Sequence, residues 1–165
     1  MTPEAWNKLS LQSPNLFGGG GAAYSKQDLL AACQGLREWK TAYMEYHYCG
    51  DLAQRHKVYA GLMSDSFDIA EIVDWWKLSK KHVGKINKMC ELAVIELEYK
   101  DAKQRKKEKR KFQAMTDKKR AKYIGVSERS WYRGYNRIYA RILSIPSYWE
   151  HEVLKTVGRR LKMAE

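Results

Sequence analysis

The chain has 165 residues and a formal net charge of +12, a length that favours one domain or two small ones with a real hydrophobic core. Its mean hydropathy of -0.66 and the absence of a long apolar run argue against a transmembrane helix, and the polar start MTPEAWNKLS argues against a signal peptide, so we expect a soluble cytoplasmic protein. The charge is segregated, because residues 1–75 hold 6 Lys or Arg against 9 Asp or Glu and residues 76–165 hold 25 against 10, which makes the second half the expected polyanion-binding half.

The first half of the chain is predicted to be a flexible arm followed by three helices. Residues 1–24 contain two prolines and the run Gly18 to Gly21, a composition typical of a mobile N-terminal arm. A long helix is predicted from Ser25, a plausible N-cap, to just before Gly50. A second helix is expected over 51–63, and a third is expected to begin after Asp65 or Ser66.

A fourth, long helix is predicted to begin at Ser79 and to run for more than thirty residues. Only Gly84 interrupts helical propensity in this segment. Its later part, KDAKQRKKEKRK, holds eight basic residues against two acidic ones. We interpret it either as a solvated helical connector or as a rail for phosphate groups, and the contact residues would be Lys103, Arg105, Lys106, Lys107, Lys109, Arg110 and Lys111.

The C-terminal part is predicted to contain three further helices. Thr116 begins a short helix that Gly125 ends, Ser127 caps the next helix, and Pro146 is expected to stop that helix. Ser147 and Glu150 stand at capping-box spacing for a final helix. Because no useful stretch alternates with the period of a strand, we predict an all-α fold: a compact multi-helix domain with a C-terminal helix-turn-helix and a long basic connecting helix.

The expected organisation follows from these elements. It is an arm over 1–24, a helical body over 25–100, a basic connector over 101–115, and a helix-turn-helix with the C-terminal helix over 116–165.

A helix-turn-helix pattern is centred on Gly125. The motif needs a small residue where the helices cross, a glycine in the turn and a hydrophobic anchor six residues later, and Ala121, Gly125 and Trp131 have these spacings. The second helix would then present residues to a DNA major groove, where Arg reads guanine and Asn reads adenine. The predicted DNA-binding residues are Lys118, Lys119, Ser127, Glu128, Arg129, Tyr132, Arg133, Asn136, Arg137 and Arg141.

The arginines of this second helix recur every fourth residue. A step of four residues turns a helix by only about 40° beyond a full turn, so Arg129, Arg133, Arg137 and Arg141 should share one broad stripe. Trp131, Tyr135, Ile138 and Ile142 should form the core face. Two positions depart from the motif, since Arg120 and Gly134 stand where a hydrophobic and a larger packing residue are usual.

A weaker copy of the motif lies 48 residues upstream, in IVDWWKLSKKHVGKIN. Lys77 stands there in place of the turn glycine, and a helical hairpin used only for packing would give the same pattern. Lys80, Lys81 and Lys85 are candidate contacts to a nucleic-acid backbone in either arrangement.

Signals for catalysis or metal binding are weak. No phosphate loop, zinc-protease or nucleophile-elbow motif occurs, and the three cysteines form no C-x-x-C pair. Asp65, Asp68, Glu71 and Asp74 would hold a divalent cation in a nuclease, but the spacing more often marks a solvent-exposed face or an acidic patch for a protein partner. We expect no enzymatic activity, no cofactor and no metal.

Two segments, IGVSERSWYRGYNRI and IVDWWKLSKKHVGKI, together with the lysine-rich connector between them, resemble the late-gene transcription antiterminators (Q proteins) of the lambdoid phage 21 type. The resemblance covers most of the chain in length and plan, with its motifs between about residues 67 and 143.

This resemblance implies a protein that binds double-stranded DNA at a late promoter, in one or two copies, engages the host RNA polymerase with its sigma factor, and narrows the RNA exit channel. Ser127, Arg129, Arg133 and Asn136 would read the DNA element, the acidic N-terminal half would contact polymerase, and nascent RNA would be a further partner. The implied location is the bacterial cytoplasm.

Two other functions fit the sequence. One is a conventional helix-turn-helix repressor or activator, which would dimerise through an apolar helix such as Leu29 to Tyr48. The other is an RNA-binding or nuclease-like phage protein that uses the lysine-rich run and the acidic cluster.

Overall fold

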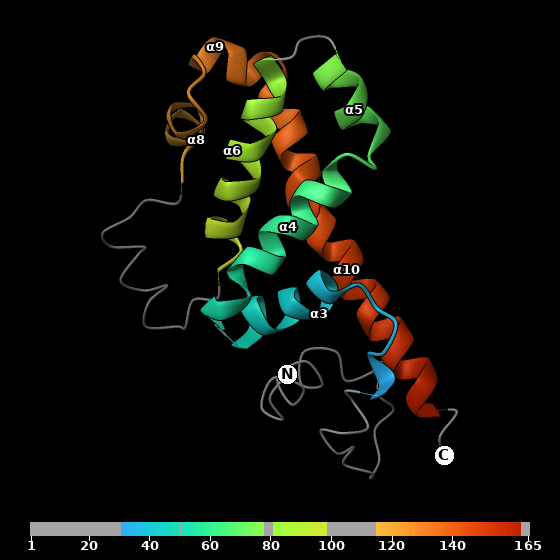
Figure 1. The fold of residues 1–165 in the computed structure, drawn as a ribbon. Coiled ribbons are helices and arrows are strands. Elements are labelled where there is room, and N and C mark those ends of the chain that lie inside the picture. The colour runs from blue at the N-terminus through green and yellow to red at the C-terminus, as the bar shows by residue number, and fades with distance from the viewer. Residues whose placement is uncertain (1–30, 50, 78–80, 99–114, 163–165) are drawn as a thin grey trace. The chain divides into compact units, whose positions relative to one another are not determined.

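The computed structural model describes residues 31–49, 51–77, 81–98 and 115–162, and within these ranges the chain is helical and contains no strand (Figure 1). The predicted all-α class is therefore confirmed. The chain forms two compact units, one of Met1–Val58 with Pro146–Glu165 and one of Tyr59–Ile145. Residues 31–58 and 146–162 thus belong to a common unit.

The first unit contains a helix that is interrupted near its beginning. Gly35 has a φ of 81°, a left-handed conformation that ends a helix. The next helix, α3 (Glu38–Met44), begins three residues later. A π-helical turn over Glu45–Cys49 follows it. The prediction of one unbroken helix up to Gly50 was wrong, because Gly35 forms a turn.

The second half of α10 (Asn136–Lys162) packs against this segment. Trp149 meets the ring of Tyr43 edge to face at 5.9 Å, and Arg160 donates to the carbonyl oxygens of Ala32, at 3.0 Å, and Gln34. The buried side chains of the unit include Ala42, Tyr43, Met44, Tyr46, Trp149, Val153 and Val157.

A short 3-10 turn, Leu52–Gln54, leads into α4 (Arg55–Ser66). Asp51 caps the turn by accepting a hydrogen bond from the amide of Ala53 at 3.0 Å. The helix predicted over 51–63 is thus present, with its end three residues later than expected.

The second unit is built around α5 (Ala70–Lys77), α6 (Lys81–Glu96), α8 (Asp117–Ile124) and α9 (Glu128–Ser130). A π-helical turn, η3 (Trp131–Tyr135), joins α9 to α10. The buried side chains include Leu62, Ile72, Ile86, Met89, Leu92, Ile124, Trp131, Ile138 and Ile142. The predicted core face at Trp131, Ile138 and Ile142 is confirmed.

Two predicted helix ends differ from the structure. α10 continues through Pro146, so Ser147 lies inside a helix and does not cap a new one. A proline inside a helix costs about 3 kcal/mol, but the buried residues Ile142, Ile145, Trp149 and Val153 recur along α10 on both sides of it, and their burial favours a continuous helix. The second difference concerns the long helix predicted from Ser79, since α6 ends at Glu96.

Several predictions fall outside the described residues. They are the arm over 1–24, the cap at Ser79, and the basic connector, apart from Met115.

Candidate nucleic-acid interface

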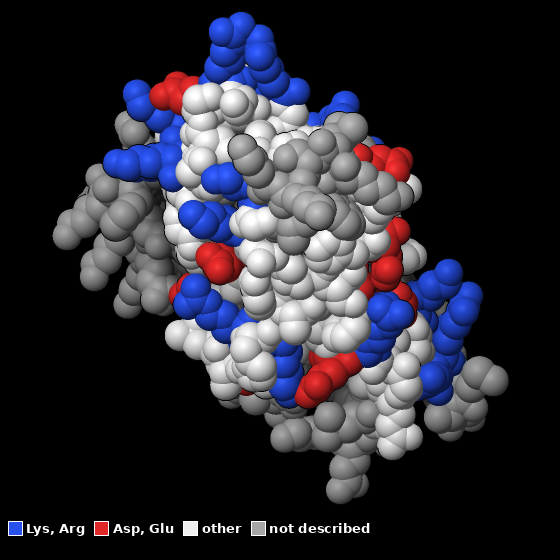
Figure 2. Space-filling view, turned by 45° about the horizontal axis from the view of Figure 1, so that its top comes forward, with Lys and Arg blue, Asp and Glu red and all other residues white. Residues whose placement is uncertain are grey.

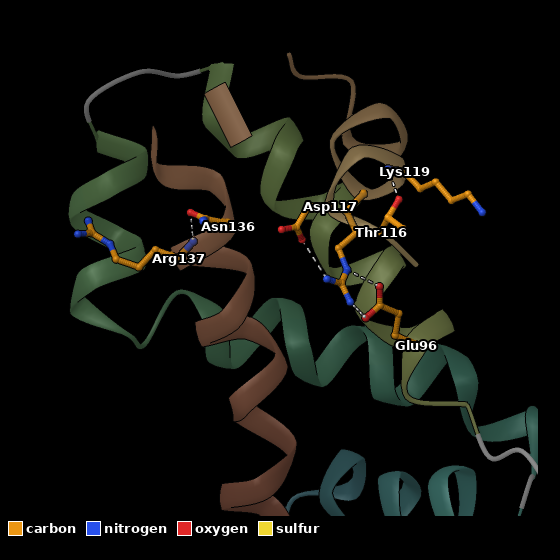
Figure 3. A network of polar contacts seen from close by, with 7 residues as sticks. Glu96, Thr116, Asp117, Lys119, Asn136 and Arg137 are labelled. Atoms are coloured by element: carbon orange, nitrogen blue, oxygen red, sulfur yellow. Dashed lines mark hydrogen bonds and ion pairs between the residues drawn. The ribbon is translucent and has the colours of Figure 1, made fainter. Parts of the chain in front are cut away.

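The helix α8 has a defined beginning and a defined end. Thr116 is its N-cap, and its hydroxyl accepts a hydrogen bond from the amide of Lys119 at 3.4 Å (Figure 3). At the other end Gly125 adopts the left-handed conformation, with φ 74° and ψ 47°. The amide of Val126 then donates to the carbonyl of Ala121 at 2.9 Å, which satisfies a carbonyl that the helix itself leaves open.

The next helix begins directly after this turn. Ser127 is its N-cap, and its hydroxyl accepts from the amide of Ser130 at 3.2 Å. Two short helices therefore meet across Gly125, Val126 and Ser127, and the predicted boundaries at Thr116, Gly125 and Ser127 are confirmed. That this pair enters a DNA groove stays a prediction.

The predicted packing residues of the pair are buried. Ala121 and Trp131 each have 1% exposure, and Ile124 has none. Trp131 also lies against Tyr139, with ring centroids 5.7 Å apart. The side of α8 that carries Ala121 and Ile124 is thus fixed in the core, as is Trp131 at the start of η3, which leaves the polar side of α8 to the surface.

The predicted arginine stripe is divided by a change in the backbone. Gly134 has φ 178° and ψ -32°, outside the helical region, within the π-helical turn η3. Arg129 and Arg133 precede this point and Arg137 and Arg141 follow it, so the four do not lie on one regular helix. All four are nevertheless exposed.

Gly134 leaves room for an aromatic cluster. A Cβ atom at this position would lie 3.7 Å from Nε1 of Trp75, so the tryptophan occupies the space that a larger residue usually fills in this motif. Trp75 stacks on His82 at 4.0 Å and meets Tyr135 edge to face at 4.8 Å. Nδ1 of His82 lies 3.2 Å from the carbonyl of Trp75, and because a carbonyl only accepts, this nitrogen is the donor of that hydrogen bond.

The predicted DNA-binding side chains are mostly exposed. Tyr132 has 61% exposure. Lys118 forms an ion pair with Glu128, with 3.5 Å between Nζ and Oε1. Asn136 is half-buried, and its Oδ1 accepts from the amide of Arg137 at 2.7 Å (Figure 3). The remaining exposed members are Lys119, Ser127, Arg129, Arg133, Arg137 and Arg141.

Positive charge dominates this part of the surface. Figure 2 shows one face of the molecule, on which Lys and Arg side chains project at the upper end with a small acidic group beside them. Within the described ranges, Arg129 and Arg133 form no hydrogen bond or ion pair with another side chain. Both guanidinium groups are therefore available to an external acceptor.

One basic residue of α8 points inward and is not part of the exposed set. Arg120 forms two hydrogen bonds with Glu96, from Nε to Oε1 at 2.9 Å and from Nη2 to Oε2 at 3.0 Å, and a third with Asp117 at 3.1 Å (Figure 3). Its guanidinium also lies 5.7 Å from the centre of the Tyr139 ring. The hydrogen bonds to Glu96 raise the pKa of Arg120 above its usual value, so the group stays charged.

Lys85 is predicted to contact a nucleic-acid backbone, and this stays a prediction. Its ammonium donates to the carbonyl oxygens of Ile124 at 2.9 Å and Gly125 at 2.7 Å. The lysine therefore caps the end of α8 from α6. Sequence analysis missed this role because nothing in the local pattern distinguishes a lysine that caps another helix from one that faces water.

The other predicted polyanion contacts have no described side chain. This applies to Lys80, Lys81, Lys103, Arg105, Lys106, Lys107, Lys109, Arg110 and Lys111.

The described thiols have the properties of structural cysteines. Burial raises the pKa of Cys33 to about 11 and that of Cys90 to about 12, which keeps both thiols protonated at neutral pH. In the part of the chain that the structure describes, no group of three or more His, Cys, Asp or Glu side chains is placed to hold a metal ion.

Comparisons of the chain with protein-family models, with curated protein sequences and with solved structures found no match. Among the described helices, none is both long and apolar enough to cross a membrane.

Proposed function

We propose that this protein is a phage transcription antitermination factor that binds a promoter-proximal DNA element and then associates with host RNA polymerase. The observation that carries the DNA-binding part is the position of Arg129 and Arg133. Both are exposed and have no partner among the described residues, and they follow a Ser127-capped turn whose opposite side is anchored by buried Trp131.

The division of labour in this proposal follows from position. Residues after the turn, namely Ser127, Arg129, Arg133 and Asn136, read base edges. Lys118, Lys119, Arg137 and Arg141 contact phosphates, which orient the protein without specifying sequence. Because Arg120 and Lys85 are engaged within the protein, they take no part in this contact.

The polymerase part of the proposal rests on the resemblance of IGVSERSWYRGYNRI and IVDWWKLSKKHVGKI to the phage antiterminators. In this proposal the acidic N-terminal half contacts polymerase and the bound protein narrows the RNA exit channel, which suppresses pausing and terminator hairpins. The mechanism is steric and needs no catalytic group. A conventional repressor or activator is the second candidate, because the same exposed arginines would serve it equally well.

Selection of duplexes from a randomised pool by the full-length protein tests the DNA-binding part. A recurring sequence that binds at least about a thousandfold more tightly than random duplex would support it, since specific binding typically exceeds non-specific binding by this factor or more. Enrichment of no sequence, with binding that depends only on salt, would contradict it.

A further inference from the structure

The turn between α8 and α9 is held by a residue from a different helix. Lys85 lies in the second turn of α6, 39 residues before Ile124 in the sequence. Its ammonium reaches the carbonyls of both Ile124 and Gly125. These carbonyls close α8, where helical hydrogen bonds run out and partial negative charge collects.

The contact places the ammonium where it affects the turn directly. A Cβ atom on Gly125 would lie 3.2 Å from Nζ of Lys85, which shows how closely the lysine approaches the backbone. The next residues, Val126 and Ser127, complete the turn and start α9. Any shift of the Gly125 carbonyl therefore changes the direction of α9 after the turn.

A second contact between the same two helices fixes the other end of α8. Glu96, the last residue of α6, binds Arg120 near the beginning of α8 through two hydrogen bonds. Because Lys85 near the start of α6 binds the end of α8, the two helices are joined at two points. The position of α8 is thus determined by α6, and Lys85 extends that control into the turn.

We propose that Lys85 is a positioning residue that fixes the turn and thereby sets the orientation of Arg129 and Arg133 toward DNA. The inference rests on the proposed function for its consequence, but the hold on the turn is a property of the protein alone. In this role Lys85 does not touch DNA.

The chain offers a closely matched control. Lys88 lies one turn further along α6, and its Nζ would be 3.9 Å from a Cβ on Gly125. In the described part of the chain it forms no hydrogen bond or ion pair. Lys85→Met and Lys88→Met therefore remove the same charge from the same helix, but only Lys85→Met removes the two bonds to the turn.

The first measurement is amide hydrogen exchange at Gly125 and Val126 in full-length protein without DNA. Both amides donate to carbonyls of α8, so their exchange reports on the closed turn. Lys85→Met should accelerate it by about tenfold, the factor expected when charge-assisted hydrogen bonds are lost, and Lys88→Met should leave it unchanged. Equal rates in Lys85→Met and the wild type would overturn the proposal.

The second measurement compares the affinity for the duplex selected by the wild-type protein with the affinity for a scrambled duplex. Lys85→Met should reduce this ratio by about tenfold, while binding to the scrambled duplex stays close to that of Lys88→Met. An equal loss on both duplexes with unchanged exchange would make Lys85 a phosphate contact and overturn the proposal. Should the wild type prefer no duplex, the proposed function fails, and the exchange rates alone decide whether Lys85 holds the turn.

Two further variants keep the test decisive. Lys85→Arg retains donors for both carbonyls and should restore the sequence preference. If Lys85→Met does not fold, the shorter and neutral Lys85→Gln replaces it, with exchange at Gly125 and Val126 again expected to accelerate. Wild-type exchange in Lys85→Gln would contradict the proposal.

Discussion

Arg120 and Glu96 form a two-bonded ion pair between α8 and α6, with N to O distances of 2.9 and 3.0 Å. In the helix-turn-helix pattern this position usually holds a hydrophobic residue, and here an ion pair occupies it. The side chains are largely covered, with 26% and 18% exposure. The pair is therefore part of what holds α8 in place.

We expect Arg120→Ala to lower the free energy of unfolding by about 2–3 kcal/mol, because it leaves Glu96 partly buried and without its partner. Lys119→Ala, at an exposed neighbouring position, should change stability by no more than about 0.5 kcal/mol. Chemical denaturation measures both values. Equal effects of the two substitutions would show that the ion pair contributes nothing beyond an exposed charge.

Gly125 and Gly84 should respond to alanine in opposite directions. Gly125→Ala places an alanine in the left-handed backbone conformation and brings its Cβ to 3.2 Å from Nζ of Lys85. The substitution should therefore destabilise the protein by at least about 1 kcal/mol. Gly84 lies inside α6 with no atom within 4 Å of an added Cβ, and Gly84→Ala should stabilise it by about 0.5–1 kcal/mol. Thermal denaturation of the two variants tests this; a stabilised Gly125→Ala would contradict the described turn.

The free energy of unfolding should fall at alkaline pH because the folded protein buries a thiol and a phenol that resist ionisation. Burial raises the pKa of Cys90 from 9.0 to about 12, and burial also raises the pKa of Tyr139. Above pH 9 the unfolded chain loses these protons first, so it binds fewer protons than the folded chain and unfolding becomes easier as pH rises. Each group contributes a slope of up to about 1.4 kcal/mol per pH unit.

Cys90→Ala should therefore reduce the decline in unfolding free energy between pH 9 and 11, measured under reducing conditions. Its lower stability at neutral pH does not matter, because the comparison is between slopes. An unchanged slope would show that the thiol of Cys90 does not resist ionisation in the folded protein.

Arg133 and Lys119 should differ in how they affect DNA binding. If Arg133 reads a base, Arg133→Ala costs about 1–3 kcal/mol on the selected duplex and little on random DNA. Lys119→Ala should weaken binding to both duplexes alike and reduce the slope of log affinity against log salt concentration by about one. Affinity measurements at two or more salt concentrations separate the roles. A uniform loss in Arg133→Ala would make it a phosphate contact.

Local signals in the sequence were sufficient for the helix pair. Thr116 and Ser127 at N-cap positions and Gly125 between them predict the boundaries of α8 and α9, because N-cap hydrogen bonds and a left-handed glycine act on residues close in the sequence. The core face through Trp131, Ile138 and Ile142 also followed from helical spacing. These features are encoded within a few residues of where they act.

Features that depend on distant residues were not predicted. The roles of Lys85 and Arg120 depend on partners 24 to 40 positions away, and their spacing in the sequence is that of ordinary surface charges. The local preference of Pro146 predicts a helix end, whereas buried side chains on both sides keep α10 continuous. The break at Gly35 is not evident from the local pattern, because the surrounding residues favour a helix.

The most direct measurement of the proposed function is transcription by bacterial RNA polymerase through an intrinsic terminator, on a template that carries the late promoter of the genome encoding this protein. The proposal predicts readthrough that requires both the protein and that promoter and is lost in Arg133→Ala. Unchanged termination in the presence of tightly bound protein would contradict antitermination and leave a conventional DNA-binding regulator.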